Sequence, residues 1–204
     1  MMSAPEKVVL FNGTDLNNWT TRDGNVAGWV VEDGIATVTQ GKGDIMTKEV
    51  FGDCFLHVEF RVPDMPEEEG QGKGNSGVYI HGRYEIQVLD SYGLEPGKGD
   101  CSAVYDCHAP LFNACKPAEE WQSYDIIFRT ARFDEAGNLT EKPRLTLLHN
   151  GMPVHNNIVL ENVTGGAMGE IVKEGPLLLQ DHGNKVSYRN IYVYRLPEKG
   201  LDRY

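Results

Sequence analysis

Short runs in which apolar and polar residues alternate recur along almost the whole chain. Successive side chains of a β-strand point to opposite faces, so this period of two predicts strands with one buried face. Turn residues separate the runs, and Asp33-Gly34 and Asn150-Gly151 are strong hairpin sequences. We expect strands at residues 7–11, 29–32, 35–39, 45–47, 53–62, 77–81, 84–89, 123–130, 144–149, 152–160, 175–181 and 186–195.

Many short strands of this kind fit two packed sheets. The chain of 204 residues can bury a large core, since 40% of its residues are hydrophobic and only 24% are charged. The 23 glycines and 10 prolines lie between the apolar runs, as expected where many turns join many strands. We predict an all-β fold, a two-sheet antiparallel jelly-roll sandwich, with residues 1–204 in a single domain.

The charge of the chain excludes some partners. Its formal net charge is −11, and no cluster of lysine and arginine offers a local exception. Such a chain repels a phosphate backbone, so we expect no nucleic-acid partner. No apolar stretch approaches the roughly 20 residues needed to span a membrane. The opening MMSAPEKVVLF lacks the basic start and apolar region of a signal peptide, and localisation stays open.

Three of the four cysteines, Cys101, Cys107 and Cys115, lie in the longest interval without a predicted strand, residues 91–120. A disulfide between Cys107 and either of the other two is geometrically compatible with a loop, whereas zinc would normally require closer pairs. Free thiols are the default alternative. A loop of this length usually shapes a binding surface or carries function.

Several predicted strands carry a face of polar side chains that can hydrogen-bond hydroxyl groups. An antiparallel sheet that simply exposes its outer face to water is the structural alternative for any one strand. Solvent faces favour lysine, glutamate and threonine, however, so the composition of these faces indicates a sugar-binding cleft. The faces comprise His57, Glu59 and Arg61 in the first strand, Asn75, Tyr79 and His81 in the second, and Glu85 and Gln87 in the third.

A family resemblance covers nearly the whole chain. It rests on the segments LFNGTDLNNW, VEDGIATV, FGDCFLHVEFRVP, GNSGVYIHGRYEIQVLDS, AVYDCHAP, EEWQSYDI, GPLLLQDHG and VSYRNIYVYRL, in this order. With these segments the chain resembles the 3-keto-disaccharide hydrolase domain family, which has the concanavalin A-like lectin and glucanase jelly roll. The resemblance also implies that an exported or periplasmic origin is compatible with the sequence.

The resemblance implies a hydrolase that cleaves glycosides whose sugar is oxidised at carbon 3. A 3-keto group acidifies the proton on carbon 2, so a base can remove it, the glycosidic oxygen can leave by elimination, and water then adds. This chemistry needs a base, a group that stabilises the enolate, and an acid for the leaving group. A non-catalytic carbohydrate-binding module on the same scaffold is the alternative function.

A conventional endo-β-glucanase is the third and weakest interpretation. Laminarinase- and lichenase-like glycosidases are similar in placing three carboxylates along one bulged strand, spaced like Glu85, Gln87 and Asp90. Retaining cleavage needs two carboxylates about 5–5.5 Å apart, so Glu85 and Asp90 would need a bulge near Val88-Leu89 to share a face. Gln87 also removes the central charge.

We assign candidate roles on this basis. Glu85 is the leading base or sugar ligand, although an exposed strand carboxylate is its structural alternative, and Asp90 could instead form an Asx-turn. Arg61 and Arg189 could bind a keto group or merely pair with acidic neighbours. Catalytic candidates are Glu85, Asp90 and His182; substrate-binding candidates are Glu59, Arg61, Asn75, Tyr79, His81, Gln87, His108, Trp121, Gln180 and Arg189, and Tyr105 is a further stacking candidate.

No cofactor is certain from the sequence. No short ligand motif such as HExxH occurs. Structural calcium or another divalent metal remains a candidate, with acidic residues in the ranges 67–69 or 100–106 as ligands. The expected partner is an oligosaccharide or glycoside substrate.

Overall fold

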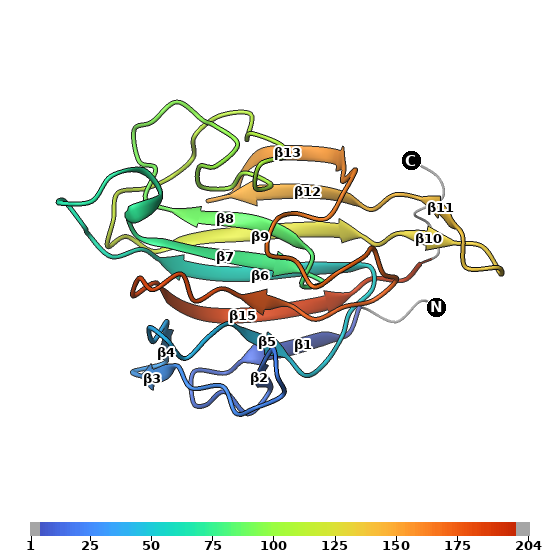
Figure 1. The fold of residues 1–204 in the computed structure, drawn as a ribbon, viewed down its shortest axis with the longest axis horizontal. Coiled ribbons are helices and arrows are strands. Elements are labelled where there is room, and N and C mark those ends of the chain that lie inside the picture. Colours follow the sequence, from blue (N-terminus) through green and yellow to red (C-terminus); the bar gives the residue numbers. More distant parts are fainter. Residues whose placement is uncertain (1–4, 199–204) are drawn as a thin grey trace.

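Two antiparallel sheets pack against each other in the computed structural model, which describes residues 5–198 (Figure 1). The large sheet runs in the order β13 (Met152–Val159), β12 (Arg144–His149), β9 (Gln122–Arg129), β6 (Cys54–Arg61), β15 (Ser187–Arg195), β4 (Ile35–Thr37) and β3 (Val30–Glu32), and β1 (Lys7–Phe11) also pairs with β15. The small sheet runs β2 (Trp19–Thr21), β5 (Ile45–Thr47), β14 (Leu178–Leu179), β7 (Asn75–Ile80) and β8 (Tyr84–Leu89). A separate ribbon pairs β10 (Arg132–Phe133) with β11 (Leu139–Glu141), and η1 (Gly70–Gly72) is a single 3₁₀ turn.

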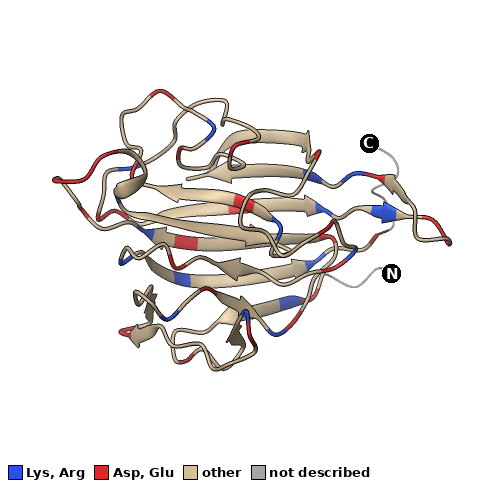
Figure 2. Ribbon diagram, viewed as in Figure 1, with Lys and Arg blue, Asp and Glu red and all other residues tan. Residues whose placement is uncertain are grey.

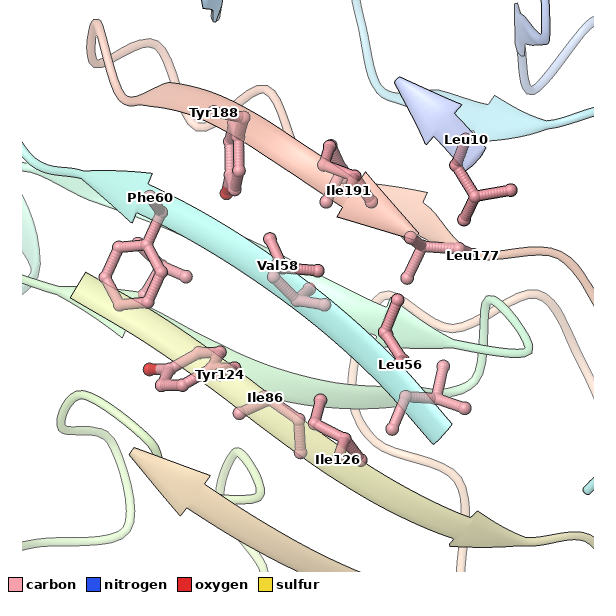
Figure 3. Packing of buried hydrophobic residues seen from close by; sticks show 14 of the residues in the cluster. Leu10, Leu56, Val58, Phe60, Ile86, Tyr124, Ile126, Leu177, Tyr188 and Ile191 are labelled. Carbon is pink, nitrogen blue, oxygen red and sulfur yellow. The ribbon is translucent and has the colours of Figure 1, made fainter. Parts of the chain in front are cut away.

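The core lies between the two sheets, where the apolar face of each strand is buried (Figure 3). Along β6 every second residue is buried, so Val58 and Phe60 point inward while Glu59 points outward. Ile86 and Val88 of the small sheet belong to the same apolar cluster. Complete burial of a side chain of this size stabilises the fold by about 1.5–3 kcal/mol. The sandwich therefore has two outer faces that point in opposite directions.

The structure confirms the predicted fold class and most of the predicted strands. The alternation places β1, β5, β8 and β12 with their observed bounds, and the other predicted strands overlap observed ones. The short strands β2, β10 and β11 are additional. Residues 1–4 and 199–204 lie outside the described residues, and the single-domain prediction for 1–204 stays a prediction. Within residues 5–198 no helix is long and apolar enough to cross a membrane.

The long loop of residues 91–120 covers the free edge of β8. Gln87 N donates to Ala103 O at 2.9 Å, Ser102 N donates to Gln87 O at 2.9 Å, and Tyr105 N donates to Glu85 O at 3.1 Å. The loop thus satisfies the backbone groups that an edge strand would otherwise expose. All four cysteines are free, so neither predicted disulfide forms, and the alternative of free thiols holds.

Candidate active site

A cleft of about 290 Å³ lies on the outer face of the small sheet, above β7 and β8. Its lining is dominated by carboxamide and phenol side chains and contains a single carboxylate. Figure 2 shows that carboxylate as an acidic position within β8. The lining residues are Gln71, Asn75, Tyr79, Glu85, Gln87, Tyr105, Gly165, Gly166, Gln180 and His182.

The pairing of β7 with β8 builds the floor of the cleft. Tyr79 lies opposite Glu85, and Gly77 lies opposite Gln87, in an antiparallel register without a shift. Because alternate side chains share a face, Glu85 and Gln87 point into the cleft while Ile86 points into the core. Gly77 leaves room for the carboxylate in its observed position, since an added Cβ would lie 2.5 Å from Glu85 Oε1.

Glu85 is a buried carboxyl group whose pKa is raised well above its usual value. Its side chain is only 4% exposed, and its backbone N–H donates to Thr164 Oγ1 at 2.9 Å. The pKa of Glu85 is raised to about 7: burial is the main cause, a hydrogen bond with Tyr79 opposes it, and the nearby charge of Asp44 adds to it. Near neutral pH this group can therefore both accept and release a proton.

Tyr79 connects Glu85 to the opposite wall of the cleft. Gln180 Nε2 donates to the Tyr79 hydroxyl at 3.2 Å, and that hydroxyl donates to Gly165 O at 3.4 Å. Burial and the Glu85 charge raise the pKa of Tyr79, which keeps the phenol protonated. Gln180 Oε1 is buried and has no hydrogen-bond partner among the described residues.

Three further carboxamides complete the floor and one rim. Asn75 Nδ2 donates to Gln71 O at 2.9 Å, and Gln71 Nε2 donates to Gly99 O at 2.8 Å. The Gln87 amide nitrogen donates to Gln71 Oε1 at 2.9 Å, and with the amide turned over it would donate instead to Glu85 Oε1 at 3.3 Å and to Ser76 O at 3.0 Å. These groups present both donors and acceptors, as recognition of sugar hydroxyls requires.

Asp90 does not reach the cleft. The β7–β8 ladder runs without a bulge as far as Leu89, and Asp90 lies just beyond the end of β8 and is not among the lining residues. There its carboxylate accepts a hydrogen bond from Lys73 Nζ at 3.1 Å, and its backbone N–H donates to Gly74 O at 3.0 Å. The structure therefore does not bring Asp90 together with Glu85 in the cleft. The residues lining the cleft offer no pair of carboxylates.

The structure also separates Glu59, Arg61, Trp121 and Arg189 from Glu85. Glu59 and Arg61 lie on β6, Arg189 lies on β15, and Trp121 directly precedes β9, so all four belong to the large sheet. Their side chains point away from the core on the opposite side of the sandwich. Period-two alternation had grouped them with the cleft residues, but it does not specify which sheet a strand joins.

The three candidate histidines have different environments. His182 is exposed at the rim of the cleft. His81 has a φ of 57°, which ends the alternation of β7 and turns the imidazole into the core beside the Phe128 ring, with centroids 4.6 Å apart. Burial lowers the pKa of His81 to about 4. His108 pairs with Val104 within the long loop of residues 91–120, and it is not among the lining residues.

Comparison with known proteins identifies the family. The model of the 3-keto-α-glucoside-1,2-lyase-like domain matches residues 6–194. The chain belongs to this family. A search of curated proteins found no match.

One solved structure agrees with this assignment to the lyase-like family, and two more distant ones share the fold. A candidate glycosyl hydrolase from Parabacteroides distasonis has 37% sequence identity and a TM-score of 0.85, over 93% of this chain and 84% of that one. A second from the same organism has 21% identity and a TM-score of 0.69, over 94% of each chain. A carbohydrate-binding module from Bacillus subtilis shares the fold, with 14% identity and a TM-score of 0.51 over 87% of this chain and 95% of that one.

Sequence reasoning missed three residues that line the cleft of this lyase-like domain. Gln71 lies between the strands predicted at residues 53–62 and 77–81, and η1 places its side chain against Asn75. Gly165 and Gly166 line the cleft beside the Tyr79 hydroxyl, and a Cβ at Gly166 would lie 3.1 Å from that oxygen. The Gly-Gly pair was the available sequence signal for this close approach.

The predicted metal remains an expectation for this lyase-like domain. Within residues 5–198 no group of three or more His, Cys, Asp or Glu side chains is arranged to hold an ion. Of the candidate calcium ligands, Asp100 Oδ2 accepts a hydrogen bond from Gly97 N at 2.6 Å. The arrangement in the cleft itself offers one base, neutral hydrogen-bond donors and a rim histidine.

Proposed function

We propose that the protein cleaves 3-keto-glycosides by elimination, with Glu85 as the general base. The observation that carries this proposal is a single buried carboxylate whose pKa lies near 7, beside a phenol and among carboxamides. Proton abstraction next to a ketone requires one base, whereas retaining glycoside cleavage requires two carboxylates. Family membership supports the same class of substrate.

In the proposed reaction the Glu85 carboxylate removes the proton from carbon 2, and the C–H electrons form the enolate of the C3 ketone. The enolate then forms a double bond between carbons 1 and 2 while the bond from carbon 1 to the glycosidic oxygen breaks. That oxygen takes up a proton and leaves as the free alcohol. Addition of water across the double bond would complete net hydrolysis.

Neutral donors would stabilise the enolate. The Tyr79 hydroxyl and the amides of Asn75 and Gln180 are fixed in or beside the floor of the cleft and carry no charge that would require a counter-ion. Fixed donors of this kind lower the barrier because they need no reorganisation when charge develops. His182, exposed at the rim, is the proposed acid for the departing oxygen.

The two alternative functions have weaker support. A binding module of similar fold is known, but that likeness concerns the fold alone. A conventional endo-β-glucanase would need a second carboxylate beside Glu85, and Asp90, which pairs with Lys73, does not line the cleft. The elimination chemistry uses the one carboxylate that the cleft provides.

The direct test is aglycone release from a chromogenic 3-keto-glucoside, with the unoxidised glucoside as the matched substrate control. We expect release only from the oxidised compound, and a Glu85→Gln variant to lose about 10²–10⁴-fold in rate. Glu59→Gln is the matched control variant, since it removes a carboxylate on the opposite face. Binding of the 3-keto-glucoside without release would favour the module, and release from the unoxidised glucoside would favour a conventional glycosidase.

A further inference from the structure

A second concave site lies on the outer face of the large sheet, on the opposite side of the sandwich from Glu85. It has a volume of about 460 Å³, and its lining includes Trp121, Arg189, Glu59, His57 and Ser123. β6 and β15 supply its floor, while the segment before β9 supplies one wall. The proposed reaction uses none of these residues.

Trp121 is the aromatic component of this groove. Its ring lies 4.0 Å from the Arg189 guanidinium and 5.2 Å from that of Arg61, measured to the ring centroid. The other two tryptophans, Trp19 and Trp29, are 1% and 4% exposed and belong to the core. Trp121 remains half-buried, so part of its indole surface is available to a ligand.

The polar groups beside Trp121 are held in place by one another. Arg189 Nε donates to Glu59 Oε2 at 2.6 Å, and Asn190 Nδ2 donates to Glu59 Oε1 at 2.8 Å. His57 Nδ1 lies 2.6 Å from Asp125 Oδ1. Such fixed groups lose little conformational entropy when a ligand binds.

The pairing of charges also indicates the kind of ligand. Arg189 is paired with Glu59, and Arg61 lies 3.8 Å from Glu119. Lys116, the other cation in the lining, donates through Nζ to Trp121 O at 3.0 Å, so the groove offers no cluster of free cations that would select an anion. Planar polar groups beside the exposed part of an indole suit the hydroxyls and the apolar C–H groups of uncharged sugars.

We propose that this groove is a second carbohydrate-binding site, which holds an uncharged oligosaccharide separately from the cleft. A polysaccharide chain bound here would anchor the protein to its source of substrate, while the cleft stays open on the other side. Once the polymer is bound in the groove, its other sugar units are present at a high effective concentration around the cleft of the same molecule. The groove takes no part in bond cleavage.

Tryptophan fluorescence reports on this site because Trp121 is the accessible indole of the three. The probes are the uncharged hexasaccharides of the cello, laminari, malto and xylo series, titrated into the full chain. We expect at least one to shift the emission saturably, and the Glu85→Gln variant to give the same response. Calorimetry with that sugar should show that the Trp121→Ala substitution raises the dissociation constant about tenfold or more.

Arg189→Ala is the second variant, since it keeps the Trp121 reporter, and thermal melting verifies that each variant folds. Weaker binding in both variants supports the proposal. The proposal is overturned if no hexasaccharide changes the emission. It is also overturned if binding survives Trp121→Ala and is lost in Glu85→Gln, because the sugar then occupies the cleft.

Discussion

Tyr79 and Glu85 lie directly opposite each other across the β7–β8 pair, and hydrogen bonding with the tyrosine side chain lowers the pKa of the buried carboxyl group. Gly77, two residues before Tyr79, leaves the space that the carboxylate occupies. This arrangement gives the cleft one base that is poised near neutral pH. The predictions below follow from it.

The rate of cleavage should rise as pH increases through about 7. Burial raises the pKa of Glu85 to about 7, and the proposed base must be ionised to accept the C2 proton. We expect kcat/KM for a 3-keto-glucoside to increase from pH 5.5 and to level off above pH 8. A profile that is flat across this interval would argue that Glu85 is not the base.

The same carboxyl group should lower the stability of the fold in alkaline solution. Its pKa is higher in the folded chain than in the unfolded chain, so the folded state binds the proton more tightly, and stability falls as pH rises from about 4.5 to about 7. Glu85→Gln should therefore raise the free energy of unfolding at pH 8 by at most about 3 kcal/mol, with little effect at pH 4. Urea unfolding at both values measures this, and equal effects at pH 4 and pH 8 would contradict it.

Gly77→Ala should reduce activity without unfolding the protein. The new Cβ would lie 2.5 Å from Glu85 Oε1 and 2.8 Å from Tyr79 Cε2, so the carboxylate must move. A shift of about 1 Å in a reacting group costs about 10²-fold in rate. Gly52→Ala is the matched control, because its nearest neighbours lie 3.8 Å away. Equal kcat/KM values for the two variants would show that the position of the carboxylate is not critical.

Tyr79→Phe should move the pH dependence as well as lower the rate. Removal of the hydroxyl takes away the hydrogen bond that lowers the pKa of Glu85, so that pKa should rise further. We expect the midpoint of the kcat/KM profile to shift to higher pH. A lower rate with an unchanged midpoint would indicate that the hydroxyl only binds substrate.

The sequence predicts the sandwich and the floor of the cleft well because both depend on local alternation. β8 has its predicted bounds, and Glu85 and Gln87 share a face as the pattern requires. The short strands β10 and β11 escaped prediction because neither is buried, so they lack an apolar face. Apolar and polar residues alternate in the sequence only where one face of a strand is buried.

The assembly of the site depends on long-range pairing, which alternation does not encode. Glu59 and Glu85 occupy similar patterns, yet β6 and β8 join different sheets and expose them on opposite faces. His81 leaves its expected face because its backbone is left-handed. Gln71 enters the cleft through a turn whose sequence indicates only flexibility.

The fate of the hydrogen on carbon 2 tests the proposed elimination most directly. A 3-keto-glucoside deuterated at carbon 2 is cleaved in ordinary water, and the sugar product is compared by mass spectrometry with substrate incubated without enzyme and with Glu85→Gln. We predict slower cleavage than for the undeuterated compound and loss of the deuterium from every product molecule beyond the background exchange. Cleavage at an unchanged rate, with the deuterium retained in the sugar, would contradict proton abstraction by Glu85.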